Sequence, residues 1–464
     1  MQIHSVASNF AERMSSVDRA WLEMDEPRNP MVVAGVLQAS EVKSAATLGR
    51  TLAERLLRYP RFSERPDDAH SPPLWIPDDV DLGYHVRVHR LPRRGAAAAL
   101  QAAVAEELAA ELDHGRPLWR LTLFPQPGRR ATVLFRGHHA MADGVALLQV
   151  LVNCTDAAAK KAQAIAHPKN HNGHDGPLGG LIDRLEGFNH LLEGLREVAV
   201  SDLRQPKQLL QQWQGARRTA QAVRRVLTLP QNNPPALRRS LSGHRRVAWM
   251  NDLPLARVKR LAHRLRVKVN DVFVAALAGA LGDVLRGNGV GMSDAQNLRV
   301  SIPVNLRNGN DDDLGNCFGL VLLDLPIAVQ DPLLCLKLVS QRMAALKGSP
   351  EAKAVLMSLA AAGHLPVSWE KKLVGVVGGK AVAVVSNLPG PRRHLKLAGS
   401  RIDNLVFWPP QAGGIGLGVS LLSYAGRISI GINADAALMP EPQQLVDAFV
   451  AELRELERLS KSAP

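Results

Sequence analysis

Two adjacent histidines followed by an Asp-Gly pair form the part of this chain that is best suited to chemistry. Residues 138–144 read His-His-Ala-Met-Ala-Asp-Gly and follow an apolar run over residues 132–136. An imidazole titrates near neutral pH, so it can act as a general base toward a hydroxyl or an amine. The pattern therefore indicates a catalytic base at the end of a strand.

Strand geometry gives the two histidines different roles. Successive side chains of a strand point to opposite faces, so one imidazole faces a cavity while the other is structural. Asp143 can accept hydrogen bonds from loop amides or pair with an arginine, and Gly144 permits a tight entry into an apolar helix predicted over residues 145–152. The residues alone leave open a second interpretation, a strand end followed by an Asp N-cap.

Strands and helices alternate irregularly around this segment. Apolar spacing predicts helices over residues 44–58, 96–112, 255–265, 271–285 and 440–459. Alternating or short apolar runs predict strands over residues 84–90, 118–124, 132–137, 245–249, 298–304, 319–325, 382–387, 403–408, 416–424 and 427–433. The sequence therefore predicts an α/β (α+β) chain.

The chain is predicted to have two domains and a connection. Residues 1–177 form an N-terminal domain that carries the His-His motif, and residues 244–464 form a second domain of the same mixed character. Between them, residues 178–243 are dense in Arg and Gln, helical in pattern over most of their length, and read as a crossing connection. A length of 464 residues suits two or three domains.

Composition limits the partners. The chain has 57 Lys and Arg against 43 acidic residues, a net charge of +14, which attracts anionic lipid, phosphorylated ligands or nucleic acid. Only 4% of residues are aromatic, which disfavours a stacking platform for nucleic acid. No nucleic-acid partner is therefore expected. Four arginine pairs could be a solvated face or could attract lipid or ligand phosphates, namely Arg217-Arg218, Arg224-Arg225, Arg238-Arg239 and Arg245-Arg246.

Cysteine and histidine usage predicts no metal site. Cys154, Cys317 and Cys335 show neither metal-ligand spacing nor a disulfide framework, which suits a reducing compartment. The histidines within residues 167–176 lie in a polar, turn-rich stretch that reads as a loop. There is no apolar run of about 18 residues and no signal-peptide pattern. We expect a cytoplasmic protein, peripherally associated with the cytosolic membrane face or with lipid inclusions.

Several motifs in a fixed order resemble the bacterial wax ester synthase/acyl-CoA:diacylglycerol acyltransferase family. His-His-x-x-x-Asp-Gly alone is shared with condensation domains of peptide synthetases, whereas the ordered combination is specific to the family. Besides residues 138–144, the matching segments are residues 14–21, 29–31, 117–119, 270–271, 301–307, 314–316, 386–391 and 423–427.

The resemblance implies a fold and a reaction. The fold is two similar chloramphenicol-acetyltransferase-like domains of the CoA-dependent acyltransferase superfamily, with an active-site channel at their junction. His139 is the implied general base, His138 supports it, and Asp143 holds the loop. The substrates are acyl-CoA and a long-chain fatty alcohol or diacylglycerol, giving wax esters or triacylglycerol. No acyl-enzyme, cofactor or metal is implied.

The remaining motifs have structural interpretations beside functional ones. Asn270-Asp271 reads as an N-cap and first turn, which favours a structural role over catalysis. The apolar motif Pro117, Leu118 and Trp119 is expected to pack or to line the channel. Residues 386–391 read as a tight turn between strands. Asn387, with backbone amides, is a candidate donor to the oxyanion that acyl transfer generates.

Two alternative functions stay open. One is a condensation-type or polyketide-associated acyltransferase that uses a carrier-bound acyl group, although no carrier or adenylation region accompanies the motif in this sequence. The other is a non-catalytic lipid-droplet-binding protein, which would need no ordered His-Asp motif. Release of CoA from an acyl-CoA in the presence of an alcohol separates both from the first hypothesis.

Overall fold

The computed structural model describes residues 2–3, 11–70, 73–92, 94–158, 237, 239–293, 296–305, 318–346, 379–412 and 414–462. The predicted connection over residues 178–243 lies outside this set except for residues 237 and 239–243. The arginine pairs at 217–218 and 224–225, the loop 167–176 and the motif residues 306–317 lie outside it as well.

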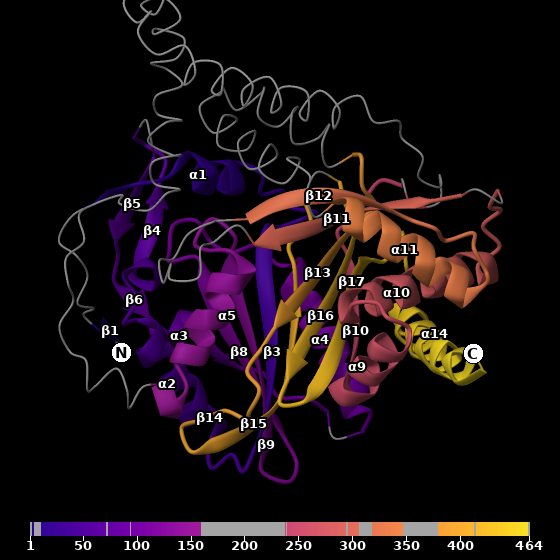
Figure 1. The fold of residues 1–464 in the computed structure, drawn as a ribbon. Coiled ribbons are helices and arrows are strands. Elements are labelled where there is room, and N and C mark those ends of the chain that lie inside the picture. Colours follow the sequence, from indigo (N-terminus) through magenta and orange to yellow (C-terminus); the bar gives the residue numbers. More distant parts are fainter. Residues whose placement is uncertain are drawn as a thin grey trace, which may run out of the picture.

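Two six-stranded mixed sheets lie side by side (Figure 1). The first has the order β14-β15-β3-β9-β8-β7, and the second has the order β10-β17-β16-β13-β11-β12. The strands of the first sheet are β3 (Val32–Ser40), β7 (Val86–Val88), β8 (Trp119–Gln126), β9 (Arg130–His138), β14 (Lys396–Leu397) and β15 (Ser400–Trp408). Those of the second are β10 (Arg245–Pro254), β11 (Leu298–Asn305), β12 (Phe318–Leu325), β13 (Ala383–Pro389), β16 (Leu417–Tyr424) and β17 (Arg427–Asp435).

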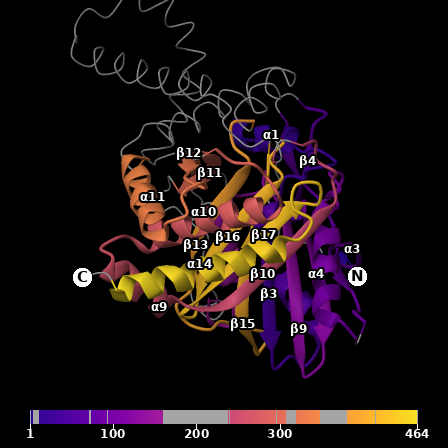
Figure 2. The same ribbon diagram turned by 90° about the vertical axis from the view of Figure 1, so that its right-hand side faces the viewer.

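Each sheet has its own helices and its own apolar core. Figure 2 shows α10 and α14 running across a face of the second sheet, and residues of both helices share one buried cluster with β11, β13, β16 and β17. The helices are α1 (Ser16–Glu23), α2 (Ala45–Leu56), α3 (Leu82–His85), α4 (Ala96–Ala109), α5 (Gly144–Asn153), α9 (Leu255–Arg264), α10 (Val269–Gly287), α11 (Pro332–Leu346) and α14 (Pro442–Ser462). Small pairings complete the fold: β1 (Gln2–Ile3) with β6 (Val80–Asp81), and β2 (Glu12–Arg13), β5 (Leu74–Pro77) and β4 (Glu64–Asp67) beside the 3-10 turn Pro60–Ser63.

The C-terminal part of the chain completes the N-terminal sheet. Strand β15 pairs antiparallel with β3 from Arg401 opposite Ser40 to Trp408 opposite Ala34. The apolar side chains of β15 join the first core, in which Trp408 is fully buried. Residues 396–408, which the sequence assigns to the second domain, therefore belong to the first sheet. No local pattern announces such a pairing, because its partners are more than 350 residues apart.

Three local predictions were wrong. Residues 82–85 form the short helix α3 before β7, because the Asp81 carboxylate accepts a hydrogen bond from the Gly83 amide at 2.9 Å. Residues 386–389 are the end of strand β13 and not a turn, because parallel pairing with β16 continues to Pro389. Helix α10 begins at Val269, so Asn270 lies inside its first turn and is not the N-cap.

No helix among the described residues is both long enough and apolar enough to cross a bilayer.

Candidate functional site

His138 is the last residue of β9 and is fully buried. The backbone amide of Ala140 donates a hydrogen bond to His138 Nδ1 at 3.1 Å, so Nδ1 carries a lone pair. The proton of the neutral ring therefore sits on Nε2, which lies 3.4 Å from Asp25 Oδ2. Burial lowers the pKa of His138 although Asp25 opposes the shift. This imidazole is a neutral, fixed group.

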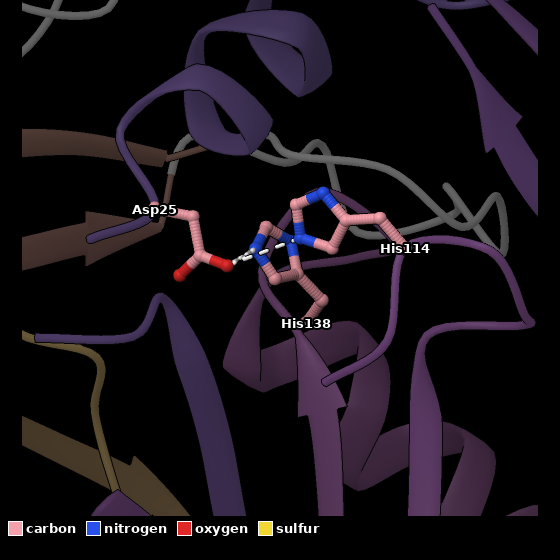
Figure 3. A group of neighbouring side chains, drawn as sticks. All are labelled: Asp25, His114 and His138. Carbon is pink, nitrogen blue, oxygen red and sulfur yellow. Dashed lines mark hydrogen bonds and ion pairs between the residues drawn. The ribbon is translucent and has the colours of Figure 1, made fainter. Parts of the chain in front are cut away.

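Asp25 and His114 complete a cluster with His138 (Figure 3). His114 Nε2 lies 3.1 Å from Asp25 Oδ2, while Asp25 Oδ1 accepts a hydrogen bond from the Met31 amide at 2.6 Å. Burial pushes the pKa of Asp25 upward, but hydrogen bonds from His114, His138 and Met31 hold it well below its usual range. The Asp25 hydrogen bond in turn raises the pKa of His114.

His139 directly follows β9, and its ring contacts helix α1. Its amide donates to the Met31 carbonyl at 2.8 Å, which fixes the backbone. Its ring stacks on Trp21 of α1 with 4.3 Å between centroids and 30° between planes. The residue is 4% exposed. His138 and His139 thus have different surroundings, one facing Asp25 and the other Trp21.

Asp143 and Gly144 start helix α5. Asp143 Oδ1 accepts hydrogen bonds from the amides of Val145 at 3.0 Å and Ala146 at 2.9 Å, so Asp143 is the N-cap of α5. A Cβ atom on Gly144 would lie 3.9 Å from Leu388 Cδ1 of β13, an ordinary contact. Gly144 has no positive φ, so the local backbone does not require glycine, and the consequence of glycine here is open space.

That space belongs to an apolar cavity at the junction of the two sheets. The cavity is narrow in this structure, with a volume of about 30 Å³. Its lining comes from β3, β9, α5, β13, β15 and β16 and includes Gly35, Gly144, Leu147, Leu388, Phe407 and Leu422. Gly144 is the last residue of the motif, so the motif contributes one residue to the lining of this cavity.

Pro117, Leu118 and Trp119 lie in the packed interior, and the lining of this cavity comes from other residues. The Leu118 carbonyl accepts a hydrogen bond from the His138 amide at 2.9 Å, and Trp119 Nε1 donates to the Phe62 carbonyl at 2.8 Å. The His85 ring stacks on Trp119 at 4.5 Å. The motif therefore holds the strand end that carries His138.

Asn270 and Asn387 meet across the second sheet. Asn387 Nδ2 donates to Asn270 Oδ1 at 2.8 Å, and Leu388, the next residue of β13, faces Gly144. Asp271 is buried; its carboxylate accepts from the Lys268 amide at 3.2 Å and from Ser340 Oγ at 3.0 Å. Asp271 therefore secures the first turn of α10 through its side chain. The sequence assigned this capping role to Asn270, one residue earlier.

One of the arginine pairs is partly internal. Arg245 is 4% exposed, and its guanidinium donates to Gln411 Oε1 at 2.5 Å and to Asn29 Oδ1. Asn29 Nδ2 in turn donates to the Ile415 carbonyl at 3.2 Å. Arg245 thus joins the loop before β3 to the second sheet instead of forming a solvated face.

Sequence reasoning missed Asp25, His114 and Trp21, the three residues that surround the two histidines. Trp21 lies within the motif block at 14–21, and His114 lies three residues before the Pro-Leu-Trp motif. A polar or aromatic residue close to a motif was the available signal. Asp25 gave none, because its partners lie 89 and 113 positions along the chain.

The arrangement suits proton abstraction and not covalent catalysis. A buried histidine such as His139 can deprotonate a hydroxyl in a site that excludes water. The two described cysteines, Cys154 and Cys335, are buried, and burial raises the pKa of each thiol to about 12. A thiol with so high a pKa is a poor nucleophile.

Comparisons with known proteins agree with this picture. Residues 14–273 match the wax ester synthase/diacylglycerol acyltransferase catalytic domain, and residues 314–457 match the C-terminal domain of the same family. A probable diacylglycerol O-acyltransferase of Mycobacterium tuberculosis is 28% identical over 442 residues, covering 89% of this chain and 88% of that protein.

Solved structures share the fold. The wax ester synthase/diacylglycerol acyltransferase of Marinobacter aquaeolei VT8 aligns with a TM-score of 0.65 and 20% identity over 97% of this chain and 100% of that one. The starter condensation domain of rhizomide synthetase, in complex with C8-CoA, aligns with a TM-score of 0.59 and 15% identity over 97% and 95%. The expected two-domain α/β acyltransferase fold is confirmed. The chain belongs to the wax ester synthase/diacylglycerol acyltransferase family and is an acyltransferase.

Proposed function

We propose that this acyltransferase esterifies long-chain fatty alcohols and diacylglycerol with acyl groups from acyl-CoA, with His139 as the general base. The observation that carries the proposal is the position of His139, which is buried and stacked on Trp21, in a motif whose last residue, Gly144, lines an apolar cavity. The names of the mycobacterial and Marinobacter relatives support diacylglycerol and alcohol acceptors.

The reaction needs one base and no covalent intermediate. The His139 imidazole takes the proton of the acceptor hydroxyl, and the oxygen attacks the thioester carbonyl to give a tetrahedral intermediate. The carbon–sulfur bond then breaks, and the imidazolium returns the proton to the departing thiolate of CoA. An oxyanion donor must stabilise the intermediate. Asn387 remains a candidate for it, although in this structure its amide is paired with Asn270.

The other assigned residues act through position. His138 holds the strand end through Asp25 and Ala140, and Asp143 holds the entry to α5. Asn270 and Asp271 support the neighbouring end of the second sheet. We assign the acyl chain to the apolar side chains that line this cavity, which would have to open to admit the chain. Burying each methylene group there would contribute about 0.8 kcal/mol. No resident cofactor is part of the proposal.

The test is transfer by the purified full-length chain. Palmitoyl-CoA is supplied with hexadecanol or with dipalmitoylglycerol, and both free thiol and ester product are measured. We expect both acceptors to give ester with stoichiometric CoA release, and His139→Ala to lower the rate about 10²- to 10⁴-fold. His70→Ala is the matched control, because His70 is exposed and pairs only with Asp67 in the described part of the chain.

Other outcomes select the alternatives. Transfer from an acyl group on a carrier protein but not from palmitoyl-CoA indicates a condensation-type enzyme. Lipid binding without thiol release indicates a non-catalytic lipid-binding protein. Near-wild-type transfer by the His139 variant, with the fold intact by circular dichroism, refutes the assigned base.

We further propose a cytoplasmic location with peripheral attachment to the cytosolic membrane face or to lipid inclusions. The net charge of +14 and the apolar acceptors support it. Flotation with vesicles that contain anionic lipid tests it. Salt-sensitive flotation is expected, and absence from the vesicle fraction at low salt contradicts it.

A further inference from the structure

The carboxylate of Asp25 joins three segments that are distant in sequence. Oδ1 accepts from the Met31 amide at 2.6 Å, just before β3. Oδ2 lies 3.1 Å from His114 Nε2, in the segment between α4 and β8, and 3.4 Å from His138 Nε2 at the end of β9. The Asp25 side chain is 10% exposed. Figure 3 shows both imidazoles directed at this single oxygen.

The hydrogen bond from Ala140 determines what His138 can offer Asp25. Since Nδ1 accepts from the Ala140 amide, the neutral ring has its proton on Nε2. The Nε2–H group of His138 faces the carboxylate of Asp25. The pKa of Asp25 is lowered, so this carboxylate is ionised at neutral pH. Asp25 therefore accepts hydrogen bonds from the Met31 amide and pairs with His114, while the His138 N–H lies 3.4 Å from the same carboxylate, longer than an ordinary hydrogen bond.

Two histidines and a carboxylate are also a set of metal ligands, with donor atoms within 4.8 Å of one another. A metal at His138 Nε2 would need the lone pair of that nitrogen while Nδ1 still accepts from Ala140. Both nitrogens would then be deprotonated, which requires an imidazolate. The hydrogen-bonded cluster needs no such species, so the geometry favours it over a metal site.

Asp25 reaches His139 by two routes. Met31 receives the Asp25 hydrogen bond on its amide and gives its carbonyl to the His139 amide at 2.8 Å. Helix α1 ends at Glu23, two residues before Asp25, and carries Trp21, whose ring stacks on His139. The carboxylate therefore secures both the backbone and the stacking partner of the reacting imidazole.

We propose that Asp25 is a positioning residue for His139, and that His114 is its partner on the solvent side. His114 is 43% exposed, so Asp25 would otherwise meet water at this edge. The inference rests on the proposed role of His139 as the base. In this chain Asp143 caps α5, and the carboxylate that orients the histidine motif comes from the turn before β3.

The kinetic test is Asp25→Asn. The amide keeps the size of the carboxylate but replaces an acceptor with an N–H donor or with a neutral oxygen, so it cannot serve Met31, His114 and His138 together. We expect kcat to fall about 10- to 100-fold, as it does when the hydrogen-bond partner that orients a metal-bound histidine is removed, with KM changed less than about twofold. Asp67→Asn is the matched control, because Asp67 pairs with exposed His70 at 2.9 Å away from the site.

His114→Gln grades the effect. Glutamine can still donate to Asp25, so kcat is expected to fall less in His114→Gln than in Asp25→Asn. Alanine cannot donate, so kcat is expected to fall further in His114→Ala than in His114→Gln. Wild-type kcat in a folded Asp25→Asn protein, or a loss confined to KM, overturns the positioning role.

A spectroscopic test does not depend on catalysis. In the wild-type chain labelled with ¹⁵N-histidine, long-range ¹H–¹⁵N spectra report the tautomer of each imidazole. We expect one ring, assigned to His138 by its loss in His138→Gln, to remain in the Nε2–H form from pH 6 to 9. A His138 ring that titrates in this range or carries its proton on Nδ1 overturns the proposal.

Metal binding gives a third outcome. Zn²⁺ is titrated into the metal-free wild type and into Asp25→Asn by calorimetry. Micromolar binding that disappears in the variant makes the cluster a metal site and overturns the proposal, whereas no difference between the two supports it. If His139→Ala retains activity, the proposed function fails while the tautomer result can still stand, so the two failures are distinguishable.

Discussion

Two strand-to-helix connections occupy corresponding places in the two sheets. In the first, the antiparallel hairpin β8–β9 leads through residues 139–143 into α5. In the second, the hairpin β16–β17 leads through residues 436–441 into α14. The first connection carries His139, while the second carries apolar residues and a proline-rich end. Similar topology thus supports two different tasks.

The two connections are held by different kinds of contact. Asp435, at the end of β17, accepts hydrogen bonds from the amides of Ser242, Gly243 and Ala437 and from Ser242 Oγ, at 2.8–3.1 Å. His138, at the end of β9, instead meets the Asp25 side chain, which also holds His114. Backbone amides do not titrate, whereas imidazoles do. The first connection therefore depends on imidazole groups as well as on a carboxylate, whereas the second depends on a carboxylate held by backbone amides and a hydroxyl.

The largest effect, on the free energy of unfolding, is expected at His85, which contacts the strand paired with β9. Its Nδ1 donates to the Trp119 carbonyl at 2.8 Å, and Trp119 pairs with Gly137 of β9. Burial lowers the pKa of His85 to about 4, against the opposing effect of the Trp119 hydrogen bond. The folded state therefore favours the neutral ring. Stability is complete above the unfolded pKa of about 6.5 and is lost as pH falls toward 4.

The expected loss is roughly 3 kcal/mol across that window, at about 1.36 kcal/mol per pKa unit. Urea unfolding followed by fluorescence at pH 7 and pH 4.5 measures it. His85→Phe should be less stable at pH 7, because Phe cannot donate to Trp119, but should lose the greater part of this pH dependence. A variant whose urea midpoint falls with pH as steeply as that of the wild type contradicts the assignment.

A smaller effect, on the opposite side of the comparison, is expected from Asp435→Asn. Burial tends to raise the pKa of Asp435, but hydrogen bonds from Ser242, Ala437 and Gly243 lower it on balance. Its contribution is present above the ordinary Asp pKa and is lost only as pH falls through the lower folded value. Replacing the charge should cost about 1–3 kcal/mol at pH 7 and leave the activity per folded molecule unchanged. A reduced kcat with unchanged stability in Asp435→Asn would contradict the assignment of a purely structural role to the second connection.

Local sequence signals predicted the elements of both connections. Apolar alternation predicted β9 and β17, and periodicity predicted α5 and α14, because each pattern reports burial on one face of one element. The separation of His138 from His139 also followed from strand alternation alone, and the two side chains do have different surroundings.

Contacts between distant segments could not be predicted in this way. Strand β15 joins β3 through backbone hydrogen bonds, which carry no signature of the partner strand. Asp25 meets its two histidines only after three segments have folded together. The start of α10 was placed two residues late because Asn270 is a better N-cap than Lys268. The helix start is secured instead by the carboxylate of Asp271, three residues after Lys268.

The smallest expected effect concerns the first residue of each helix. Helix α14 begins with Pro442, a residue favoured at the first helical position because its fixed φ suits a helix. Helix α5 begins with Gly144, although its φ is not positive and a Cβ would meet Leu388 only at 3.9 Å. Backbone geometry therefore explains why proline stands at position 442, but it does not explain why glycine stands at position 144. Lining the apolar cavity does explain it.

Gly144→Val tests that explanation. Valine adds a Cβ atom, which makes only an ordinary contact with Leu388, and two methyl groups. The two methyl groups would occupy cavity space equal to about two methylene groups of an acyl chain, each worth about 0.8 kcal/mol. Transfer from palmitoyl-CoA should therefore fall about tenfold relative to transfer from hexanoyl-CoA, with hexadecanol as the acceptor. Gly291→Val is the matched control, because a Cβ there meets no heavy atom within 4 Å. A loss that is equal for both donors would assign Gly144 to the positioning of the base, and unchanged selectivity would place the acyl chain outside this cavity.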